Sequence, residues 1–184
     1  MPRASHLLFF ELASANAFLD CLLLPHVSHI RLKFPPNKVL LGENLVLGQK
    51  IFEGKGKSGA GFIKSVSMEG VKQIYSWTAQ VKGFGPAKDV ECFLAVTAKG
   101  NTPPKGLGTA KDIGIFNTPT GEMGTLKGYD ISKMVDGKTM SVGLWSFMTM
   151  AEKLSWLNDV IAVVTFEALD PMWQEFNITI YEWK

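Results

Sequence analysis

Histidine, arginine and cysteine are scarce in this sequence, and most of them stand at its beginning. All three histidines and both arginines precede residue 32, and only one cysteine, Cys92, follows it. A Ser-His-Asp or Cys-His catalytic set therefore cannot be built from residues 39–184 alone, unless the beginning of the chain folds back onto them. His26 and His29 have no third ligand beside them, so we expect no metal and no cofactor.

Strong positive charge and long apolar runs are also missing. The formal net charge is +2, and lysine is the only strong base after residue 31. Phosphates and bases are commonly bound through arginine, so we expect no nucleic-acid partner. No run approaches the roughly 20 apolar residues of a membrane-spanning helix, so we expect no integral membrane segment. Two cysteines cannot form a disulfide framework, which favours a reducing compartment and predicts a cytoplasmic protein.

The first 38 residues differ in composition from the rest, and we interpret them as an N-terminal extension. Glu11 and Asp20 interrupt its two apolar blocks, whereas a secretory signal needs an unbroken apolar core. An amphipathic helix that packs on the domain or lies on a membrane surface is a second interpretation. A misread translation start, with the true start near residue 39, is a third. In each case residues 39–184 form the folded domain.

Residues 39–184 have the pattern of a succession of short strands. β-Branched and aromatic residues alternate with polar ones, and glycine turns recur at spacings of roughly 8 to 12 residues. In the last run, Phe176, Ile178 and Ile180 share one face, while polar and aromatic residues share the other. No convincing helix follows residue 38. The sequence therefore predicts an all-β fold, an antiparallel closed or nearly closed barrel of about eight strands, after a helical or disordered extension.

One glycine-rich segment matches a nucleotide-binding pattern. Residues 54–59 fit G-x-G-x-x-G, which holds a pyrophosphate only when a helix begins directly after it. Residues 62–68 alternate like a strand instead, so we interpret the glycines as a bend in a strand or a barrel corner. The longest loop is expected at residues 99–110.

Three segments near the C-terminus resemble the end of a family of small uncharacterised prokaryotic proteins. They are Lys153–Asn158 with the pattern K-L-x-x-L-N, the valine-rich run Val160–Glu167, and the closing Tyr181–Lys184. The resemblance covers roughly residues 40–184 and implies a calycin-like barrel, broadly similar to the allene oxide cyclase barrel, with no implied activity. The chain departs from the family pattern at Ala168–Gln174, where the family carries an acidic, glycine-containing hairpin.

A barrel of about eight strands has an interior wide enough for side chains or one small ligand. We therefore predict that the protein binds a small apolar or aromatic molecule in its lumen, with aromatic walls and a polar anchor. The predicted ligand-binding residues are Tyr75, Trp77, Glu91, Trp145, Trp156, Asn158, Glu167 and Tyr181.

Two other functions fit the same residues. A buried carboxylate with a raised pKa, at Glu91 or Glu167, could make the barrel a cofactor-free isomerase or cyclase, and the sequence leaves open whether it is an enzyme. A fully packed lumen would instead indicate a structural or homo-oligomerisation module. Several of the residues also have structural interpretations: Glu167 can face solvent, Asn158 can bond its own turn, and the tryptophans can be core.

Overall fold

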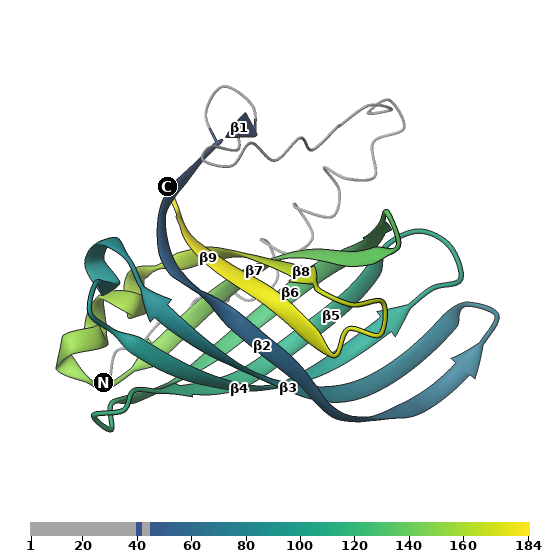
Figure 1. Ribbon diagram of the computed structural model, residues 1–184, viewed down its shortest axis with the longest axis horizontal. Coiled ribbons are helices and arrows are strands. Elements are labelled where there is room, and N and C mark those ends of the chain that lie inside the picture. The colour runs from purple at the N-terminus through teal and green to yellow at the C-terminus, as the bar shows by residue number, and fades with distance from the viewer. Residues whose placement is uncertain (1–39, 42–44) are drawn as a thin grey trace, which may run out of the picture. The chain divides into compact units, whose positions relative to one another are not determined.

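The computed structural model describes residues 40–41 and 45–184, so the extension predicted for residues 1–38 lies outside the described residues. The strands are β1 (Leu40–Leu41), β2 (Leu45–Ser67), β3 (Gly70–Gly83), β4 (Glu91–Thr102), β5 (Gly108–Asn117), β6 (Met123–Val135), β7 (Lys138–Thr149), β8 (Ile161–Ala168) and β9 (Glu175–Trp183). Each strand pairs antiparallel with the next one along the chain, and β2 also pairs with β9. The eight strands β2–β9 thus close into an antiparallel barrel, which confirms the predicted fold class (Figure 1).

Strand β2 closes the barrel because it is long enough to pair on both of its edges. It pairs with β9 from Leu47 to Lys57 and with β3 from Phe52 to Ser67. Glycine is required where these strands approach closely, since a Cβ on Gly54 would lie 1.9 Å from the carbonyl oxygen of Gln80. The glycine-rich segment is therefore part of a continuous strand with no helix after it, as interpreted from the sequence.

Two short 3₁₀ helices and one short loop differ from the expectations. Helix η1 (Gly85–Ala87) forms the β3–β4 turn, and η2 (Glu152–Asp159) lies between β7 and β8, although no helix was expected after residue 38. Leu154 and Leu157 of η2 are buried, and their apolar side chains hold the segment against the barrel. The sequence pattern could not distinguish such a short helix from a loop with apolar anchors. The expected loop 99–110 shrinks to residues 103–107, because β4 and β5 continue pairing to Asn101 and Thr109.

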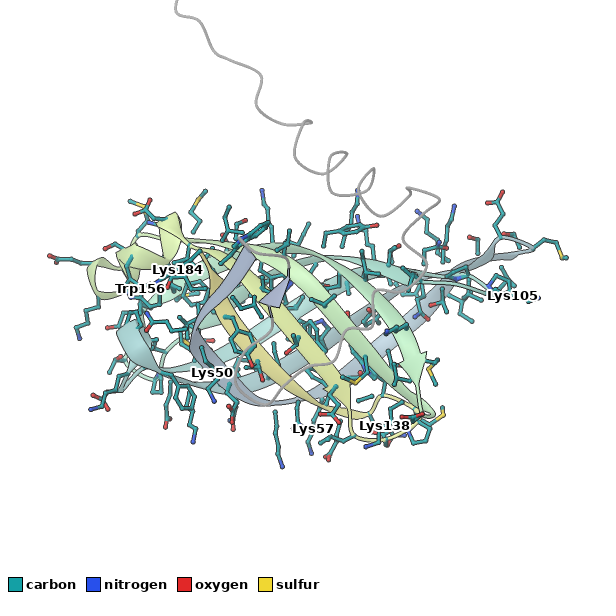
Figure 2. All side chains as sticks on the ribbon, turned by 90° about the horizontal axis from the view of Figure 1, so that it is seen from above. Lys50, Lys57, Lys105, Lys138, Trp156 and Lys184 are labelled. Atoms are coloured by element: carbon teal, nitrogen blue, oxygen red, sulfur yellow. The ribbon has the colours of Figure 1, made fainter. Side chains whose placement is uncertain are left out.

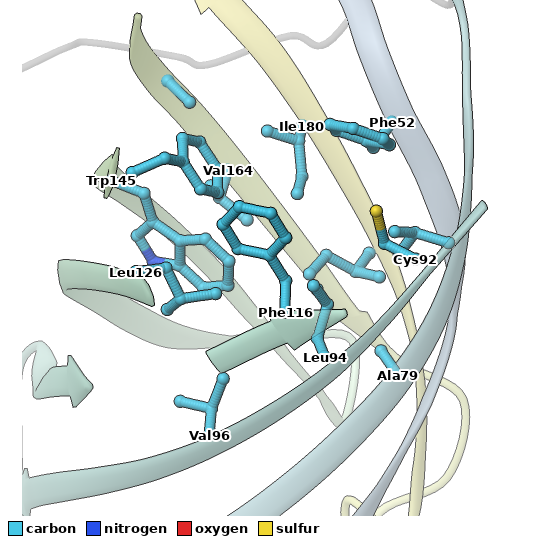
Figure 3. Close-up of a cluster of buried hydrophobic side chains, with 14 of the residues drawn as sticks. Phe52, Ala79, Cys92, Leu94, Val96, Phe116, Leu126, Trp145, Val164 and Ile180 are labelled. Atoms are coloured by element: carbon cyan, nitrogen blue, oxygen red, sulfur yellow. The ribbon is translucent and has the colours of Figure 1, made fainter. Parts of the chain in front are cut away.

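Alternation along the strands separates the interior from the outer face. The interior holds the apolar core, in which Trp77 and Trp145 are stacked with ring centroids 5.7 Å apart. Figure 3 shows part of this core, with side chains from different strands converging on Phe116. The labelled lysines in Figure 2 lie on the outside of the barrel and at its rims. Within the described part of the chain, no helix is both long enough and apolar enough to cross a membrane.

Candidate functional site

The interior contains two carboxyl groups, one from β5 and one from β6. Asp112 is 2% exposed and Asp130 is 6% exposed. In the sheet register Asp112 lies opposite Gly128, and Asp130 lies opposite Ala110. The two aspartates are therefore diagonal neighbours on the same face of adjacent strands, at a separation that their side chains can span. We call Asp112 and Asp130 the acid pair.

Two glycines make room for the side chains around the acid pair. A Cβ on Gly143 of β7 would lie 1.6 Å from Oδ1 of Asp130, so the carboxyl group leans across the space that a side chain would fill. A Cβ on Gly128 of β6 would lie 2.0 Å from the indole of Trp145, which leans over that strand in the same way. Because Gly143 and Gly128 have no side chains, the carboxyl group of Asp130 and the indole N–H of Trp145 can approach each other.

Hydrogen bonding leaves the acid pair short of donors. Trp145 Nε1 donates to Asp130 Oδ1 over 3.3 Å. The carboxyl oxygens of Asp112 have no hydrogen-bond donor among the described residues other than the carboxyl group of Asp130, with which a proton can be shared. Buried carboxylates normally have such partners, so this deficit marks a site rather than ordinary core.

Burial and mutual proximity raise the pKa of both aspartates. Burial is the main cause for Asp130, whose pKa lies well above its ordinary value, and a hydrogen bond to Asp112 and the charge of Asp112 raise it further. Burial also raises the pKa of Asp112, partly offset by its interactions with Asp130 and the nearby Trp145 indole. Two buried carboxyl groups this close favour a single proton shared between them.

Tyr75 of β3 borders the acid pair. Its ring lies over Gly100 of β4, where a Cβ would come within 3.0 Å of it. Burial raises the pKa of the Tyr75 hydroxyl, and the negative charges of Asp112 and Asp130 raise it further. The phenol therefore stays protonated and can donate a hydrogen bond.

Trp173, in the β8–β9 loop, joins the same aromatic cluster. Its ring stacks on Phe176 with centroids 5.1 Å apart and meets Tyr75 edge-on at 6.1 Å. The indole Nε1 is buried without a hydrogen-bond partner among the described residues. Trp173 also has a φ of 58°, which non-glycine residues rarely adopt. A strained residue with an unsatisfied donor at the edge of the interior is a feature that functional sites often show.

Asp170 shapes the loop that carries Trp173. Its carboxylate accepts backbone N–H hydrogen bonds from Met172 at 2.8 Å, Gln174 at 3.2 Å and Glu175 at 2.8 Å. These bonds, the one from Glu175 foremost, lower the pKa of Asp170. Ser58 on β2 adds a hydrogen bond of 2.5 Å to the carbonyl oxygen of Trp173. The loop is thus fixed on both sides of the tryptophan.

The part of the interior next to η2 is chemically different, because large apolar side chains fill it. Leu154 and Leu157 enter the core from η2. The residual space between Leu157, Phe147, Cys92 and their neighbours is about 10 Å³, roughly the size of one water. Burial, with a smaller effect of the Glu122 charge, raises the pKa of the Cys92 thiol to about 11, so this cysteine is a poor nucleophile.

A groove on the outer face lies away from the acid pair. It has a volume of about 350 Å³ and is lined mainly by β2 and β3, with Lys55, Lys57, Gln80 and Glu175 among its walls. These side chains are exposed, and Lys57 pairs with Glu175 at 3.2 Å. Exposed flexible side chains orient a ligand poorly, so we place the candidate site at the acid pair instead.

The sequence-predicted site residues occupy three different environments. Tyr75, Trp77 and Trp145 face the interior, and Tyr75 and Trp145 border the acid pair. Glu91 and Glu167 are exposed, and Tyr181 is half-buried on the outward positions of β9. Trp156 packs at the η2 end, labelled in Figure 2.

Asn158 has the structural role that its sequence context allowed. Its Oδ1 accepts the backbone N–H of Thr149 at 2.8 Å, and its Nδ2 donates to the carbonyl oxygen of Thr149 at 3.0 Å. This pair of bonds fastens the end of η2 to the end of β7. The expected polar anchors Glu91, Asn158 and Glu167 therefore do not come together in the lumen.

Asp112, Asp130 and Trp173 were not among the sequence-predicted residues. Asp112 stands between Lys111 and Ile113, and an alternating pattern there places the isoleucine inside and the aspartate outside. The structure has the reverse, with Ile113 59% exposed. The only available signal was that Gly128 and Asp130, two residues apart, share a face with the apolar Leu126. Within residues 45–184, no three His, Cys, Asp or Glu side chains gather closely enough to hold a metal ion.

Comparisons with known proteins support the fold. The chain matches no model of a known protein family and no curated protein. Among solved structures, a protein of unknown function from Clostridium acetobutylicum aligns with a TM-score of 0.63 and 12% identity, covering 74% of this chain and 97% of that one. A β-barrel-like protein from Acinetobacter baumannii aligns with a TM-score of 0.61 and 19% identity, covering 83% and 99%. An enzyme from Penicillium herquei aligns with a TM-score of 0.51 and 16% identity, covering 81% and 98%. At these identities the likeness shows a shared small-barrel fold.

Proposed function

We propose that the barrel binds a small, largely apolar or aromatic molecule at the acid pair. The observation that carries this proposal is Asp112, a buried carboxyl group that has no donor among the described residues except a proton shared with Asp130. Burying such a group costs several kcal/mol, roughly 2–7 on transfer scales, unless another molecule completes its hydrogen bonds. Trp145, Tyr75 and Trp173 supply the aromatic walls, and the acid pair supplies the polar anchor that orients the ligand.

The residues next to the acid pair are suited to leaving space for a ligand. Ala98 lies opposite Asp112 in the sheet register, and Ala110 lies opposite Asp130. Gly143 lies opposite Asp130 on the other side. Among the larger side chains nearby, the half-buried Trp173 is carried by the β8–β9 loop. Movement of Trp173 would admit a ligand and release its unsatisfied N–H to a partner.

Native mass spectrometry of the full chain purified without organic solvent tests this proposal. We expect a bound small molecule that is lost in Asp112→Asn and kept in Asp159→Asn, a control at an exposed aspartate. Two substitutions in β4 test whether the ligand needs interior space. Residue 98 faces the interior, so Ala98→Leu should block binding, whereas residue 95 faces outward, so Ala95→Leu should not.

Nuclear magnetic resonance supplies the second readout. Small aromatic probes should shift the indole N–H signals of Trp145 and Trp173 in the wild type, and should not shift them in Ala98→Leu. The proposal is overturned if no molecule co-purifies and if neither neutral nor charged probes shift these signals in a folded wild-type protein.

A second candidate function is acid–base catalysis at the same pair. One proton shared between two buried carboxyl groups provides a donor in Asp130 and an acceptor in Asp112, as proton-transfer isomerisation requires. The Penicillium herquei protein is described as an enzyme, so a barrel of this shape is compatible with catalysis. Incubating a bound carbonyl ligand in heavy water tests this: deuterium should enter beside the carbonyl, and Asp130→Asn should abolish the exchange. Wild-type exchange no faster than in free solution would exclude it.

The proposal includes three further properties: a calycin-like or allene oxide cyclase-like ancestry, a cytoplasmic location and a homo-oligomeric state. Each of them is supported by sequence patterns alone. Size-exclusion chromatography with light scattering checks the oligomeric state, and a monomer would remove that part. Packing of the η2 end favours a structural role there, which leaves the acid-pair end for the ligand.

A further inference from the structure

The missing hydrogen-bond partner of the acid pair must be a donor. The two carboxyl groups present four oxygens, and the described residues supply Trp145 Nε1 to one of them. A proton shared between the aspartates engages one oxygen of each, which leaves one oxygen of Asp112 without a donor. That oxygen accepts a hydrogen bond and donates none, so a ligand that offers only acceptors cannot complete the site.

The charge of the acid pair has no positive partner among the described residues. The described ion pairs join Lys50 to Glu53, Lys57 to Glu175, Lys153 to Glu122 and Lys184 to Glu182, and none includes Asp112 or Asp130. Three strands around the pair contribute interior residues that face it. Strand β3 contributes Tyr75, β4 contributes Ala98 and Gly100, and β7 contributes Gly143 and Trp145. Tyr75 is therefore the one further titratable group that faces the pair from these strands.

Aromatic rings complete the surroundings of this unneutralised charge. Trp145 contacts Phe166 at 5.8 Å between centroids, and Phe166 contacts Trp173 at 6.2 Å. The faces of such rings attract cations. Burial is the main cause of the raised pKa of Tyr75, and the negative charges of the two aspartates raise it further, so their potential also acts on the phenol.

We infer that the ligand presents a protonated amine to Asp112 and Asp130, with its apolar part among the aromatic rings. This inference rests on the proposed function and names the class of ligand: a small aromatic or aliphatic ammonium compound. An ammonium group offers three donors and a positive charge, and thereby supplies both things that the acid pair lacks.

Proton release on binding follows from this arrangement. Burial raises the pKa of both carboxyl groups and so favours a proton on the pair. A bound cation favours the ionised form, so binding expels that proton, and affinity weakens as the pH falls through the raised pKa of the pair. The amine itself stays protonated across this range, since alkyl ammonium groups titrate near about 10.

Titration calorimetry of the full chain with three similar probes tests the inference. Phenethylamine, phenethyl alcohol and phenylacetate share a ring and a linker, and they differ in charge. We expect the amine to bind at least about tenfold more tightly than the alcohol, which corresponds to one charge-assisted contact, and phenylacetate to bind weakest. The heat of amine binding should vary with the buffer's ionisation enthalpy, because a proton is released.

Two variants assign the effect to the acid pair. Asp112→Asn and Asp130→Asn should each remove most of the preference for the amine, and Asp159→Asn should leave it unchanged. Because both asparagines remove a buried carboxyl group without changing its shape, at least one variant is expected to fold, which circular dichroism verifies. Equal or tighter binding of the alcohol or phenylacetate overturns the inference and leaves the proposed function standing. Failure of all three probes overturns the inference, and it overturns the proposed function as well if no molecule co-purifies with the protein.

Discussion

The two ends of the barrel interior are built from the same alternating strands, but they differ in what those strands place inside. Near η2 the interior positions carry large apolar side chains, and the residual space is about the size of one water. At the acid pair the interior positions of neighbouring strands carry Ala98, Ala110 and Gly143, with Asp112 and Asp130 among them. Burial of apolar surface stabilises the first region, whereas buried carboxyl groups destabilise the second. The region near η2 therefore stabilises the fold, whereas the region around the acid pair can carry a binding site.

The greatest change in stability is expected for a substitution in the packed core near η2. Leu157→Ala should lower the free energy of unfolding by about 2–5 kcal/mol, because Leu157 is 1% exposed and its removal leaves a cavity. Urea denaturation followed by tryptophan fluorescence measures this. Leu107→Ala is the matched control, since Leu107 is 50% exposed, and it should change stability by at most about 0.5 kcal/mol. Equal effects of the two substitutions would contradict the idea that η2 closes a packed core.

At the acid pair, by contrast, a substitution is expected to raise the free energy of unfolding. Folding raises the pKa of Asp130 above its ordinary 3.8, so the folded protein binds this proton more tightly than the unfolded chain. The contribution of Asp130 to stability therefore falls as the pH rises from 3.8 through the raised value, and it stays low above that. Asp130→Asn removes this loss and should stabilise the protein by about 1–3 kcal/mol near neutral pH.

The pH dependence distinguishes this effect from a general stabilisation. Below the ordinary aspartate pKa the gain from Asp130→Asn should vanish, because both folded and unfolded wild-type chains then carry the proton. Thermal unfolding across a pH series measures the difference. Asp159→Asn, at an exposed position, should show no comparable gain at any pH. A loss of stability in Asp130→Asn near neutral pH would mean that the carboxylate is better satisfied than its hydrogen bonds indicate.

How much could be predicted from the sequence also differs between the two ends. Alternation and recurring glycine turns correctly indicated a closed antiparallel barrel, and they placed Phe176, Ile178 and Ile180 on one face of the last strand. The expectation that Tyr181, on the opposite face, lines the lumen was wrong, because those three residues face the interior. Such patterns are local, so a single sequence carries them. The aromatic residues Tyr75 and Trp145 also follow from them as interior residues.

The acid pair could not be predicted in the same way. Its formation depends on Gly143 and Gly128, which stand on other strands and become neighbours only through the register of β5, β6 and β7. Locally, burying Asp112 and exposing Ile113 contradicts the hydrophobic pattern. Conflicts of this kind between local pattern and fold are expected where a site departs from the best core.

The smallest change is expected in the β8–β9 loop, which holds Trp173 beside the interior. Asp170 uses both carboxyl oxygens, one for Met172 and Gln174 and the other for Glu175. Its lowered pKa means that it stabilises the loop above its ordinary pKa of 3.8, and that this contribution is lost as the pH falls through the lower folded value. Asp170→Asn should reproduce that loss near neutral pH, because an amide nitrogen cannot accept the N–H of Glu175.

Hydrogen exchange measured by nuclear magnetic resonance reports this local change. The backbone amides of Met172, Gln174 and Glu175 should exchange faster in Asp170→Asn, while the core amides of β8 and β9 should keep their protection. Asp136→Asn is the control, since Asp136 forms an exposed turn with a φ of 51°, which asparagine also tolerates. If the three loop amides keep their protection, stacking on Phe176 rather than Asp170 holds Trp173 in place. In that case the tryptophan belongs to the packed core, and the acid pair is closed from this side.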